Sequence, residues 1–436
     1  MIMVTKLKVE IENHEDWDFA KTDTKYMTHG IHPYPAKMIP QISKRLIERY
    51  GTKKGLVLDP FTGSGGVLVE ARLAQLNSVG IDVNPLACLL SEVKANPVDP
   101  NILENSWKKL DANIQNDIQN NTNYDLPKAL YKVKLDYWFK EQTTKDLVTI
   151  RNNIQRIENV PIRKFFSICL SSTVRKVSGT RGREFKLYRI KPEEWEKYNP
   201  DTLMEFKSQT TKYIEKMREY YQKAPHKLFS KTFIADNRTI HTDEFPEEGN
   251  IILSNTPPKL VVTSPPYGDS QTTVAYGQFS RYPALWINYE QGFENEVIMK
   301  VDKLGLGGFK NRNVIHDFPA LSKTLDAISE KDTERSMDAN SFFSDLYQSL
   351  EVMYNVVDNE STSCIVVANR TMRRIRIPTH LIIMEMAVDI GFENKITLIP
   401  RKIPSKRLPW KNAPENVQGL QGNTMSTENI IVLRKS

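Results

Sequence analysis

Two short segments of the sequence combine residue types that could do chemistry together. Residues 59–66 read Asp-Pro-Phe-Thr-Gly-Ser-Gly-Gly and follow an apolar run. Glycines between a strand and a helix let a ligand approach the backbone closely, so this segment predicts a turn for a nucleotide-type cofactor. Residues 263–267 read Thr-Ser-Pro-Pro-Tyr, where two prolines would stiffen a loop that holds an aromatic amine for alkylation. Either segment alone also fits a plain structural turn, but the pair in this order indicates an enzyme site.

The elements that must position these segments follow a strand–helix–strand rhythm, which implies parallel strands. Apolar runs that end at polar residues predict the strands, and longer amphipathic stretches predict the helices. The predicted strands are 55–59, 78–82, 232–236, 260–263, 363–368, 395–400 and 429–434, and the predicted helices are 39–50, 66–76, 85–94 and 378–391. The sequence therefore predicts an α/β protein with a doubly wound, mostly parallel, Rossmann-like sheet.

The rhythm stops after residue 100 and resumes near residue 228. Residues 1–100 hold an amino-terminal segment and the first half of the sheet, and residues 228–436 hold the second half. Between them, residues 101–227 are polar, rich in Asn, Gln and Lys, and mostly helical in pattern, so we interpret them as a helical insertion. Residues 290–340 and 401–427 fit no element and are expected to be long surface excursions, which are uncommon unless functional.

Composition is compatible with a polyanionic partner. The 436 residues include 60 Lys and Arg against 53 Asp and Glu, a formal net charge of +7. Cys88, Cys169 and Cys364 occur singly in apolar surroundings, so we expect reduced core cysteines and no metal site. No run approaches the roughly 18 consecutive apolar residues of a membrane span, and the amino terminus lacks a long apolar segment. We therefore expect a cytoplasmic protein without membrane segments.

The two segments resemble motifs I and IV of the S-adenosylmethionine-dependent DNA methyltransferases that modify exocyclic amino groups. Ser264-Pro265-Pro266-Tyr267 resembles the cytosine-N4 branch, because the adenine branch more often has Asp or Asn in place of Ser264. Residues 32–38 resemble motif X, and residues 428–434 resemble the closing strand of the family. The resemblance implies a methyltransferase sheet with an antiparallel terminal strand, and S-adenosylmethionine as the cofactor with no metal.

The resemblance also implies roles for residues around the cofactor. Asp82 would accept the ribose hydroxyls, Asp59 would face the methionine ammonium, and Asp236 would accept the adenine amino hydrogen. Aspartates at strand ends also cap turns, but three on successive strands favour the cofactor. The implied cofactor-binding residues are Tyr34, Asp59, Phe61, Gly63, Gly65, Asp82 and Asp236, and Lys37 is a further candidate at the methionine end.

The Ser-Pro-Pro-Tyr loop would carry the chemistry. The amino nitrogen of cytosine is a poor nucleophile because its lone pair is delocalised into the ring, so an enzyme must accept its hydrogens as the methyl group arrives. The Ser264 hydroxyl and the Pro265 carbonyl could accept them, Pro266 would stiffen the loop, and Tyr267 would stack on a base extruded from the duplex. Residues 272–281, which include Tyr276, could form a wall of the base pocket or a loop packed on the sheet.

A basic run suggests where DNA binds. Residues 163–191 contain nine Lys and Arg and one Glu, with Phe185 and Tyr188 interleaved. Such charges suit phosphate contacts, although a solvated helix face is the common alternative. The predicted DNA-binding residues are Arg175, Lys176, Arg181 and Arg183. The insertion 101–227 is the candidate recognition region, and residues 290–340 are a second candidate.

These observations predict a site-specific enzyme that methylates cytosine N4 in double-stranded DNA by base flipping. It would be the modification half of a restriction-modification system, with a separately encoded endonuclease as a possible partner. Three alternatives stay open: adenine-N6 methylation of DNA, guanine-N2 methylation of RNA, and an inactive DNA-binding subunit. The RNA enzymes usually carry Asp before the prolines, and an inactive subunit would need neither segment.

Overall fold

The computed structural model describes residues 7–131, 133–181, 185–268, 274–288, 295–308, 317–404 and 425–436. Its centre is an eight-stranded sheet in the order β1-β9-β10-β6-β5-β2-β3-β4. The strands are β1 (Lys8–Ile11), β2 (Leu56–Asp59), β3 (Asn77–Asp82), β4 (Ser230–Ile234), β5 (Leu260–Thr263), β6 (Ser361–Ala368), β9 (Lys395–Lys402) and β10 (Thr427–Lys435). Strand β10 pairs antiparallel with both neighbours, and all other pairs are parallel. The predicted Rossmann-like methyltransferase sheet is confirmed, including its antiparallel terminal strand.

Alternate residues of each strand supply two separate cores. Val57, Val262 and Val366 point to one face, where helices α1 (Pro40–Tyr50), α2 (Gly66–Leu73) and α3 (Pro85–Ala95) cover the sheet. The intervening strand residues, such as Val261 and Ile365, point to the other face. That face is covered by α10 (Glu247–Asn255), α13 (Pro319–Ser329), α14 (Thr333–Val356) and α15 (Thr379–Ile390). This period of two explains why the buried strands could be recognised as short apolar runs.

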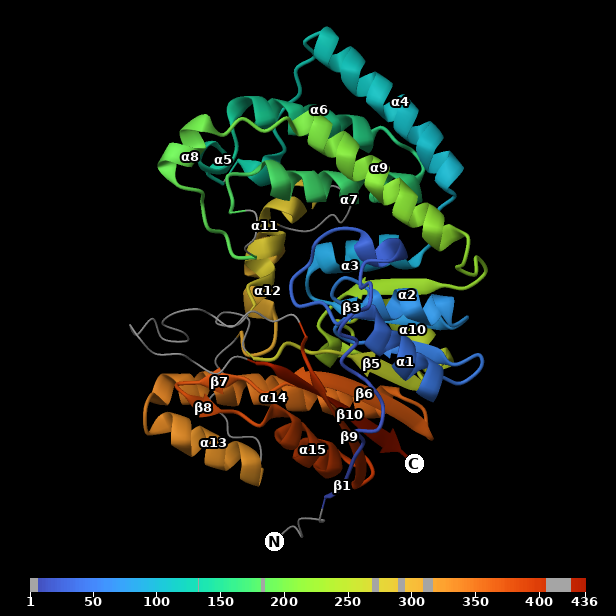
Figure 1. Cartoon of the computed structure of the whole chain (residues 1–436), viewed down its shortest axis with the longest axis vertical. Coiled ribbons are helices and arrows are strands. Elements are labelled where there is room, and N and C mark those ends of the chain that lie inside the picture. The colour runs from blue at the N-terminus through green and yellow to red at the C-terminus, as the bar shows by residue number, and fades with distance from the viewer. Residues whose placement is uncertain are drawn as a thin grey trace.

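A helical layer lies beyond α3, at the top of the molecule in Figure 1. It contains α4 (Pro100–Gln119), α5 (Leu135–Trp138), α6 (Glu141–Gln155), α7 (Val160–Val177), α8 (Pro192–Lys197) and α9 (Thr202–Tyr221). Its central helix α7 is buried along most of its length, and its apolar side chains belong to the same core as those of α3. Helices α11 (Tyr276–Trp286) and α12 (Asn295–Leu304) connect this layer to the sheet (Figure 1).

Several elements of the structure differ from the sequence prediction. Strand β4 ends at Ile234, so Asp236 lies in the following loop. Helix α2 ends at Leu73 and not at residue 76. The edge strand β1 was not predicted. The predicted excursion 290–340 contains α12, α13 and the first turns of α14, where Leu321 and Ile328 are buried against the sheet. The mixed charges of these helices lie on their outer faces and hid the apolar side of each helix from the sequence analysis.

Two further expectations concern the cysteines and membranes. All three cysteines are buried and none forms a disulfide. In the part of the chain that the structure describes, no helix is long and apolar enough to cross a membrane. Most of the predicted excursion 401–427 lies outside the described residues.

Candidate active site

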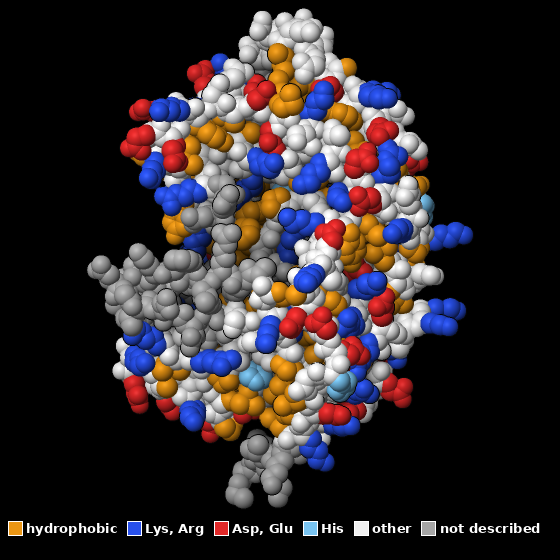
Figure 2. Space-filling model, viewed as in Figure 1, with side chains coloured by type: hydrophobic (Ala, Val, Ile, Leu, Met, Phe, Trp, Pro, Cys, Tyr) orange, Lys and Arg blue, Asp and Glu red, His pale blue; other side chains and the backbone are white. Residues whose placement is uncertain are grey.

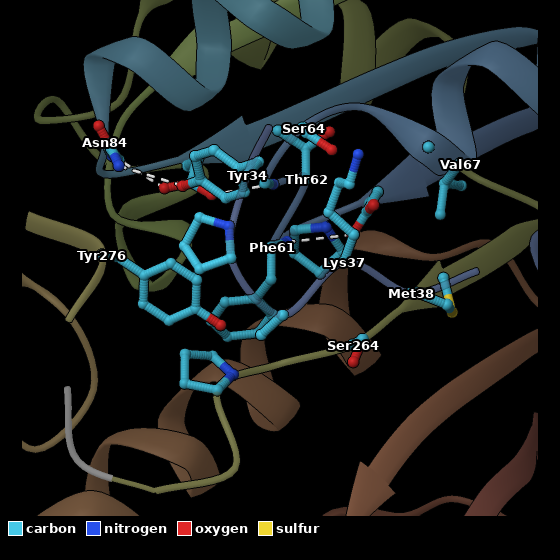
Figure 3. A pocket seen from close by; sticks show the side chains of 18 of the residues that line it. Tyr34, Lys37, Met38, Phe61, Thr62, Ser64, Val67, Asn84, Ser264 and Tyr276 are labelled. Atoms are coloured by element: carbon cyan, nitrogen blue, oxygen red, sulfur yellow. Dashed lines mark hydrogen bonds between the residues drawn. The ribbon is translucent and has the colours of Figure 1, made fainter. Parts of the chain in front are cut away.

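A cavity of about 230 Å³ opens at the carboxyl ends of β2, β3 and β5 (Figure 3). Because the carboxyl ends of parallel strands meet at one edge of the sheet, the two sequence segments converge there. The predicted site residues that line the cavity are Tyr34, Asp59, Phe61, Gly63, Asp82, Asp236, Ser264 and Pro266. Gly65, Pro265 and Tyr267 lie outside its lining. The cofactor turn and the catalytic loop therefore share one cavity.

Asp59, the last residue of β2, is a buried carboxylate that links the two segments. Its Oδ1 accepts hydrogen bonds from Thr263 Oγ1 at 2.7 Å and from the Phe61 backbone N–H at 3.2 Å. Its Oδ2 has no hydrogen-bond partner within the described ranges. Burial raises the pKa of Asp59 to about 7, although the two hydrogen bonds oppose this shift. A cationic group in the cavity would stabilise the ionised form of this buried carboxylate.

Asp82, the last residue of β3, is held by two backbone amides. The Gly63 N–H donates to Oδ2 at 3.0 Å, and the Asn84 N–H donates to Oδ1 at 2.8 Å. Burial raises the pKa of Asp82 to about 6, and the two amides lower it. The carboxylate is thus fixed in orientation at the cavity, as a group that accepts hydrogen bonds from hydroxyls must be.

Gly65 has a packing role that the sequence analysis did not predict. It has a φ of +77°, and a Cβ at this position would lie 2.6 Å from the Cα of Ser91 in α3. Gly63 also has a positive φ, of +49°, but its Cβ would meet nothing nearer than a Tyr34 ring carbon at 3.6 Å. Gly65 therefore allows α2 and α3 to approach closely, whereas Gly63 borders the cavity.

Replacing Gly65 by alanine is expected to lower the free energy of unfolding by about 2 kcal/mol, because α3 must move and the backbone conformation is strained. Gly63→Ala is the matched control and should cost only about 1 kcal/mol, from the backbone conformation alone. Urea unfolding of both variants measures the difference. If both variants lost the same free energy of unfolding, the close contact between Gly65 and α3 would not contribute to stability.

Asp236 is engaged by a neighbouring arginine. Arg238 Nε lies 2.9 Å from Asp236 Oδ1, and the same guanidinium also pairs with Asp345. Asn237, between them, donates to the Pro60 carbonyl at 2.9 Å, and its Oδ1 is buried without a partner among the described residues. Asp236 and Asn237 thus both bring acceptor oxygens to this end of the cavity.

Two lysines, Lys37 and Lys94, also line the cavity. The sequence analysis named Lys37 as a further candidate and did not identify Lys94. Lys94 is 1 % exposed, lines the cavity, and donates to the Ser64 carbonyl at 2.7 Å. Burial lowers the pKa of Lys94 well below its usual value and lowers the pKa of Lys37 to about 8. An anionic group between them would favour their charged forms. Nothing in the sequence marked Lys94, because Ser91 and Glu92 make the carboxyl half of α3 look solvent-exposed.

Aromatic side chains line the remaining side of the cavity. Figure 3 shows the Tyr34 and Tyr276 rings on the same side of the cavity, with the Tyr34 hydroxyl directed toward Asn84. The ring centroids of Tyr34 and Tyr276 are 6.0 Å apart, and the Tyr34 hydroxyl accepts a hydrogen bond from Asn84 Nδ2 at 3.1 Å. Tyr276, which belongs to the segment after the catalytic loop, therefore presents a ring to the cavity.

The catalytic loop follows β5. Ser264 Oγ lies 3.0 Å from the Val366 carbonyl and 3.3 Å from the Tyr267 hydroxyl, which in turn donates to Glu428 Oε1 at 3.0 Å. Burial and the nearby Glu428 raise the pKa of Tyr267 well above its usual value. Tyr267 thus directs its hydroxyl toward β10 and does not line the cavity, whereas Tyr276 does. The stacking of Tyr267 on a base stays a prediction.

The four predicted DNA-binding residues have different surroundings in the structure. Arg175 is partly buried with its guanidinium 4.4 Å from the Phe279 ring centroid, and burial lowers its pKa to about 10. Lys176 pairs with Glu205 at 2.8 Å. Arg181 is exposed, and Arg183 lies outside the described residues. The four arginines and lysines therefore do not form one continuous exposed surface in the part that is described.

An exposed segment between α7 and α8 lies next to the site. Phe185 and Tyr188 are 45 % and 47 % exposed. The Leu187 N–H donates to Gln278 Oε1 at 3.2 Å, and the Phe185 ring packs 5.8 Å from that of Phe279, which also contacts Tyr34. Figure 2 shows a hollow between the helical layer and the sheet, with apolar side chains inside it and Lys and Arg near its edge.

The described residues also bear on metal binding. Within the described ranges, no three His, Cys, Asp or Glu side chains are grouped as ligands of a metal ion.

Comparisons with known proteins agree with this geometry. Residues 6–92 match the family model described as DNA methylase, N6_N4_Mtase. The type II methyltransferase M.MvaI of Kocuria varians is 36 % identical over 447 residues, which cover 99 % of this chain and 96 % of that protein. M.MjaII of Methanocaldococcus jannaschii is 42 % identical over 90 residues, covering 19 % of this chain and 17 % of that protein. A tRNA (guanine(10)-N2)-dimethyltransferase of Methanothermobacter thermautotrophicus is 40 % identical over 52 residues, covering 12 % of this chain and 16 % of that protein. Of these three relatives, M.MvaI alone is similar over the full length.

Proposed function

This chain belongs to the family of type II DNA methyltransferases that modify amino groups, and from that premise we propose that it methylates the N4 amino group of cytosine in double-stranded DNA. The observation that carries the choice of base is Ser264-Pro265-Pro266-Tyr267 at the end of β5, with Ser264 in the same cavity as Asp59 and Asp82. We further propose that the enzyme is the modification half of a restriction-modification system with a separately encoded endonuclease.

The cavity fits S-adenosylmethionine, the cofactor of this family, from end to end. In this proposal Asp82 accepts hydrogen bonds from the ribose hydroxyls, and Asp236 with Asn237 accepts them from the adenine amino group. All three residues line the cavity. At the opposite end Asp59 meets the ammonium, and Lys37 with Lys94 meets the carboxylate of the methionine group. This assignment pairs the Asp59 carboxylate and the two lysines with opposite charges of the methionine group, and gives Asp82 and Asp236 neutral hydrogen-bond donors. When bound, S-adenosylmethionine supplies an electrophilic methyl group on its sulfonium.

The protein then has to hold an amino group beside that methyl group. The amino group of a paired base is inaccessible within a duplex, so the target cytosine must be extruded into the cavity. Tyr276 and Ser264 line the cavity and offer a ring for stacking and a hydroxyl that accepts an amino hydrogen. The carbonyl of the adjacent Pro265 is the second proposed acceptor. The prolines fix these acceptors, which favours the pyramidal nitrogen required for attack.

The duplex would bind across the hollow of Figure 2 and contact the exposed segment that contains Arg181, Phe185 and Tyr188. Arg181→Ala is expected to reduce the salt dependence of DNA binding by about one unit of log–log slope, because one phosphate contact is lost. Lys176→Ala should change the slope much less, because the Lys176 amine already pairs with Glu205. Fluorescence anisotropy over a range of salt concentrations measures both slopes. Equal slopes for the two variants would place the phosphate contacts elsewhere.

The proposed function is tested by identifying the product. The protein is incubated with labelled S-adenosylmethionine and plasmid DNA, and the modified nucleoside is identified by mass spectrometry after digestion. N4-methylcytosine is expected. N6-methyladenine would keep the cavity and the cofactor but overturn the choice of base, and methylation of RNA alone would overturn the substrate class.

A further inference from the structure

The catalytic loop is connected to a carboxylate that no motif of the sequence assigned. Glu428 is the second residue of β10, and in the sheet it stands opposite Ala368 of β6 and Arg401 of β9. Because β10 runs antiparallel to its neighbours, its first residues lie at the edge where the parallel strands end. The antiparallel strand thereby brings a carboxylate to the active-site edge of the sheet.

Three oxygen atoms form a chain that leads from the cavity to this carboxylate. Ser264, which lines the cavity, has its Oγ 3.3 Å from Tyr267 Oη, and Tyr267 Oη donates to Glu428 Oε1 at 3.0 Å. Glu428 Oε2 pairs with Arg401, whose Nε donates to the Trp17 carbonyl at 2.8 Å. The Glu428 side chain is 15 % exposed, whereas Arg401 is 3 % exposed. The chain thus starts at the reacting group and ends at a fixed carboxylate that reaches the solvent.

The reaction leaves a proton to be removed. When the amino nitrogen uses its lone pair to bond the methyl carbon, the sulfonium sulfur keeps the electron pair of the broken bond, and the nitrogen becomes positively charged. A neutral product forms only when one N–H proton leaves. A protonated aromatic amine is a far stronger acid than a carboxylic acid, so transfer of this proton to a carboxylate is favourable.

We propose, on the basis of the function proposed above, that Glu428 is the proton acceptor of the methyl transfer and that Ser264 and Tyr267 conduct the proton to it. As the N–H bond breaks, Ser264 Oγ takes the proton and passes its own hydrogen to Tyr267 Oη. Tyr267 passes its hydrogen to Glu428 Oε1. Ser264 and Tyr267 each end with one hydrogen, Glu428 becomes neutral, and its proton then passes to water at the exposed side of the carboxyl group.

Two properties of the chain suit this role. The raised pKa of Tyr267 keeps its phenol protonated, so that Tyr267 relays a hydrogen and does not act as the final base. Ser264 has one hydrogen and two candidate acceptors, Tyr267 Oη and the Val366 carbonyl, so it can switch between them without a change in backbone.

Tyr267→Phe tests the proposal, because it removes one oxygen of the chain and keeps the ring. Glu428→Gln removes the acceptor, and the double variant tests whether the two act as one unit. Tyr347→Phe is the matched control, because the Tyr347 hydroxyl also donates to a carboxylate, Asp389, at 2.8 Å, but neither residue lines the cavity. The measurements are the single-turnover rate of methyl transfer to DNA, its slowing in deuterium oxide, and the affinity for S-adenosylmethionine.

Each single variant is expected to transfer methyl groups about tenfold more slowly, and the double variant no more slowly than the singles. The wild type and Tyr347→Phe should be slowed in deuterium oxide by the same factor, and Tyr267→Phe should be slowed less, with cofactor affinity unchanged. Wild-type rates in Tyr267→Phe would overturn the proposal. A reduced rate with the wild-type isotope effect would also overturn it, and would make Tyr267 and Glu428 positioning residues. A wild-type protein that methylates no DNA would instead refute the proposed function.

Discussion

Replacing Asp59 by asparagine is expected to weaken the binding of S-adenosylmethionine by roughly a hundredfold while the fold is retained. A charge-assisted hydrogen bond in a buried site contributes about 2–3 kcal/mol, and asparagine cannot supply the charge. Both protein contacts of Asp59, with Thr263 and with the Phe61 amide, use Oδ1, which asparagine keeps. Isothermal titration at pH 8 measures the loss, and a variant that binds as tightly as the wild type would remove Asp59 from the cofactor site.

The pH dependence of binding gives an independent test of the same carboxylate. Burial raises the pKa of Asp59 to about 7 in the free protein, so below that pH the group is largely protonated and neutral. Only the ionised form pairs with an ammonium group. The affinity should therefore fall as the pH is lowered through about 7, and binding at pH 6 should release a proton that titration in buffers of different ionisation enthalpy detects. Asp59→Asn should lack this proton release. The variant therefore distinguishes a proton released by Asp59 from one released by Asp82, whose pKa is also raised.

The raised pKa of Asp59 also affects the stability of the protein without the cofactor. Raising the pH favours cofactor binding but lowers this stability. The pKa of Asp59 in the folded protein, about 7, lies above its ordinary value of 3.8, so between these values the native state binds more protons than the unfolded state. Stability must then decrease as the pH rises through this window. Asp59→Asn should therefore be more stable than the wild type at pH 8, with a difference that shrinks toward pH 4. Thermal unfolding at both pH values is the measurement.

The sequence predicted the site because its residues lie at strand ends. Buried parallel strands appear as short apolar runs, and the residues after them must meet at one edge of the sheet. The sequence alone therefore predicts that Asp59, Asp82 and Ser264 lie together. The left-handed conformations of Gly63 and Gly65 were equally foreseeable from a strand–turn–helix context.

Contacts between distant segments could not be predicted in this way. Lys94 is the last residue but one of α3, and nothing local distinguishes it from a surface lysine. Only the packing of α3 against the turn at Ser64 buries it. The pairing of Lys176 with Glu205 depends on how α7 packs on α9. Likewise, the contact between Tyr267 and Glu428 depends on the register of β10, which the order of strands along the chain does not reveal.

Replacing Ser264 by alanine is expected to reduce the rate of methyl transfer on the order of a hundredfold, with little change in the affinity for S-adenosylmethionine. The Ser264 hydroxyl meets the amino group of the base and not a charged group of the cofactor, and its hydrogen bond strengthens as the nitrogen becomes pyramidal. In the free protein the hydroxyl is held by the Val366 carbonyl at 3.0 Å, so it is oriented before the base arrives.

Ser264→Thr is the matched control, since it keeps a hydroxyl at the same position and should recover part of the lost rate. Single-turnover methyl transfer separates this step from product release, and titration of the cofactor separates it from binding. If alanine weakened cofactor binding as much as it slowed transfer, Ser264 would be a cofactor ligand. If alanine left the transfer rate unchanged, the acceptor of the amino hydrogen would have to be the Pro265 carbonyl alone, and the proton path to Glu428 would lose its first member.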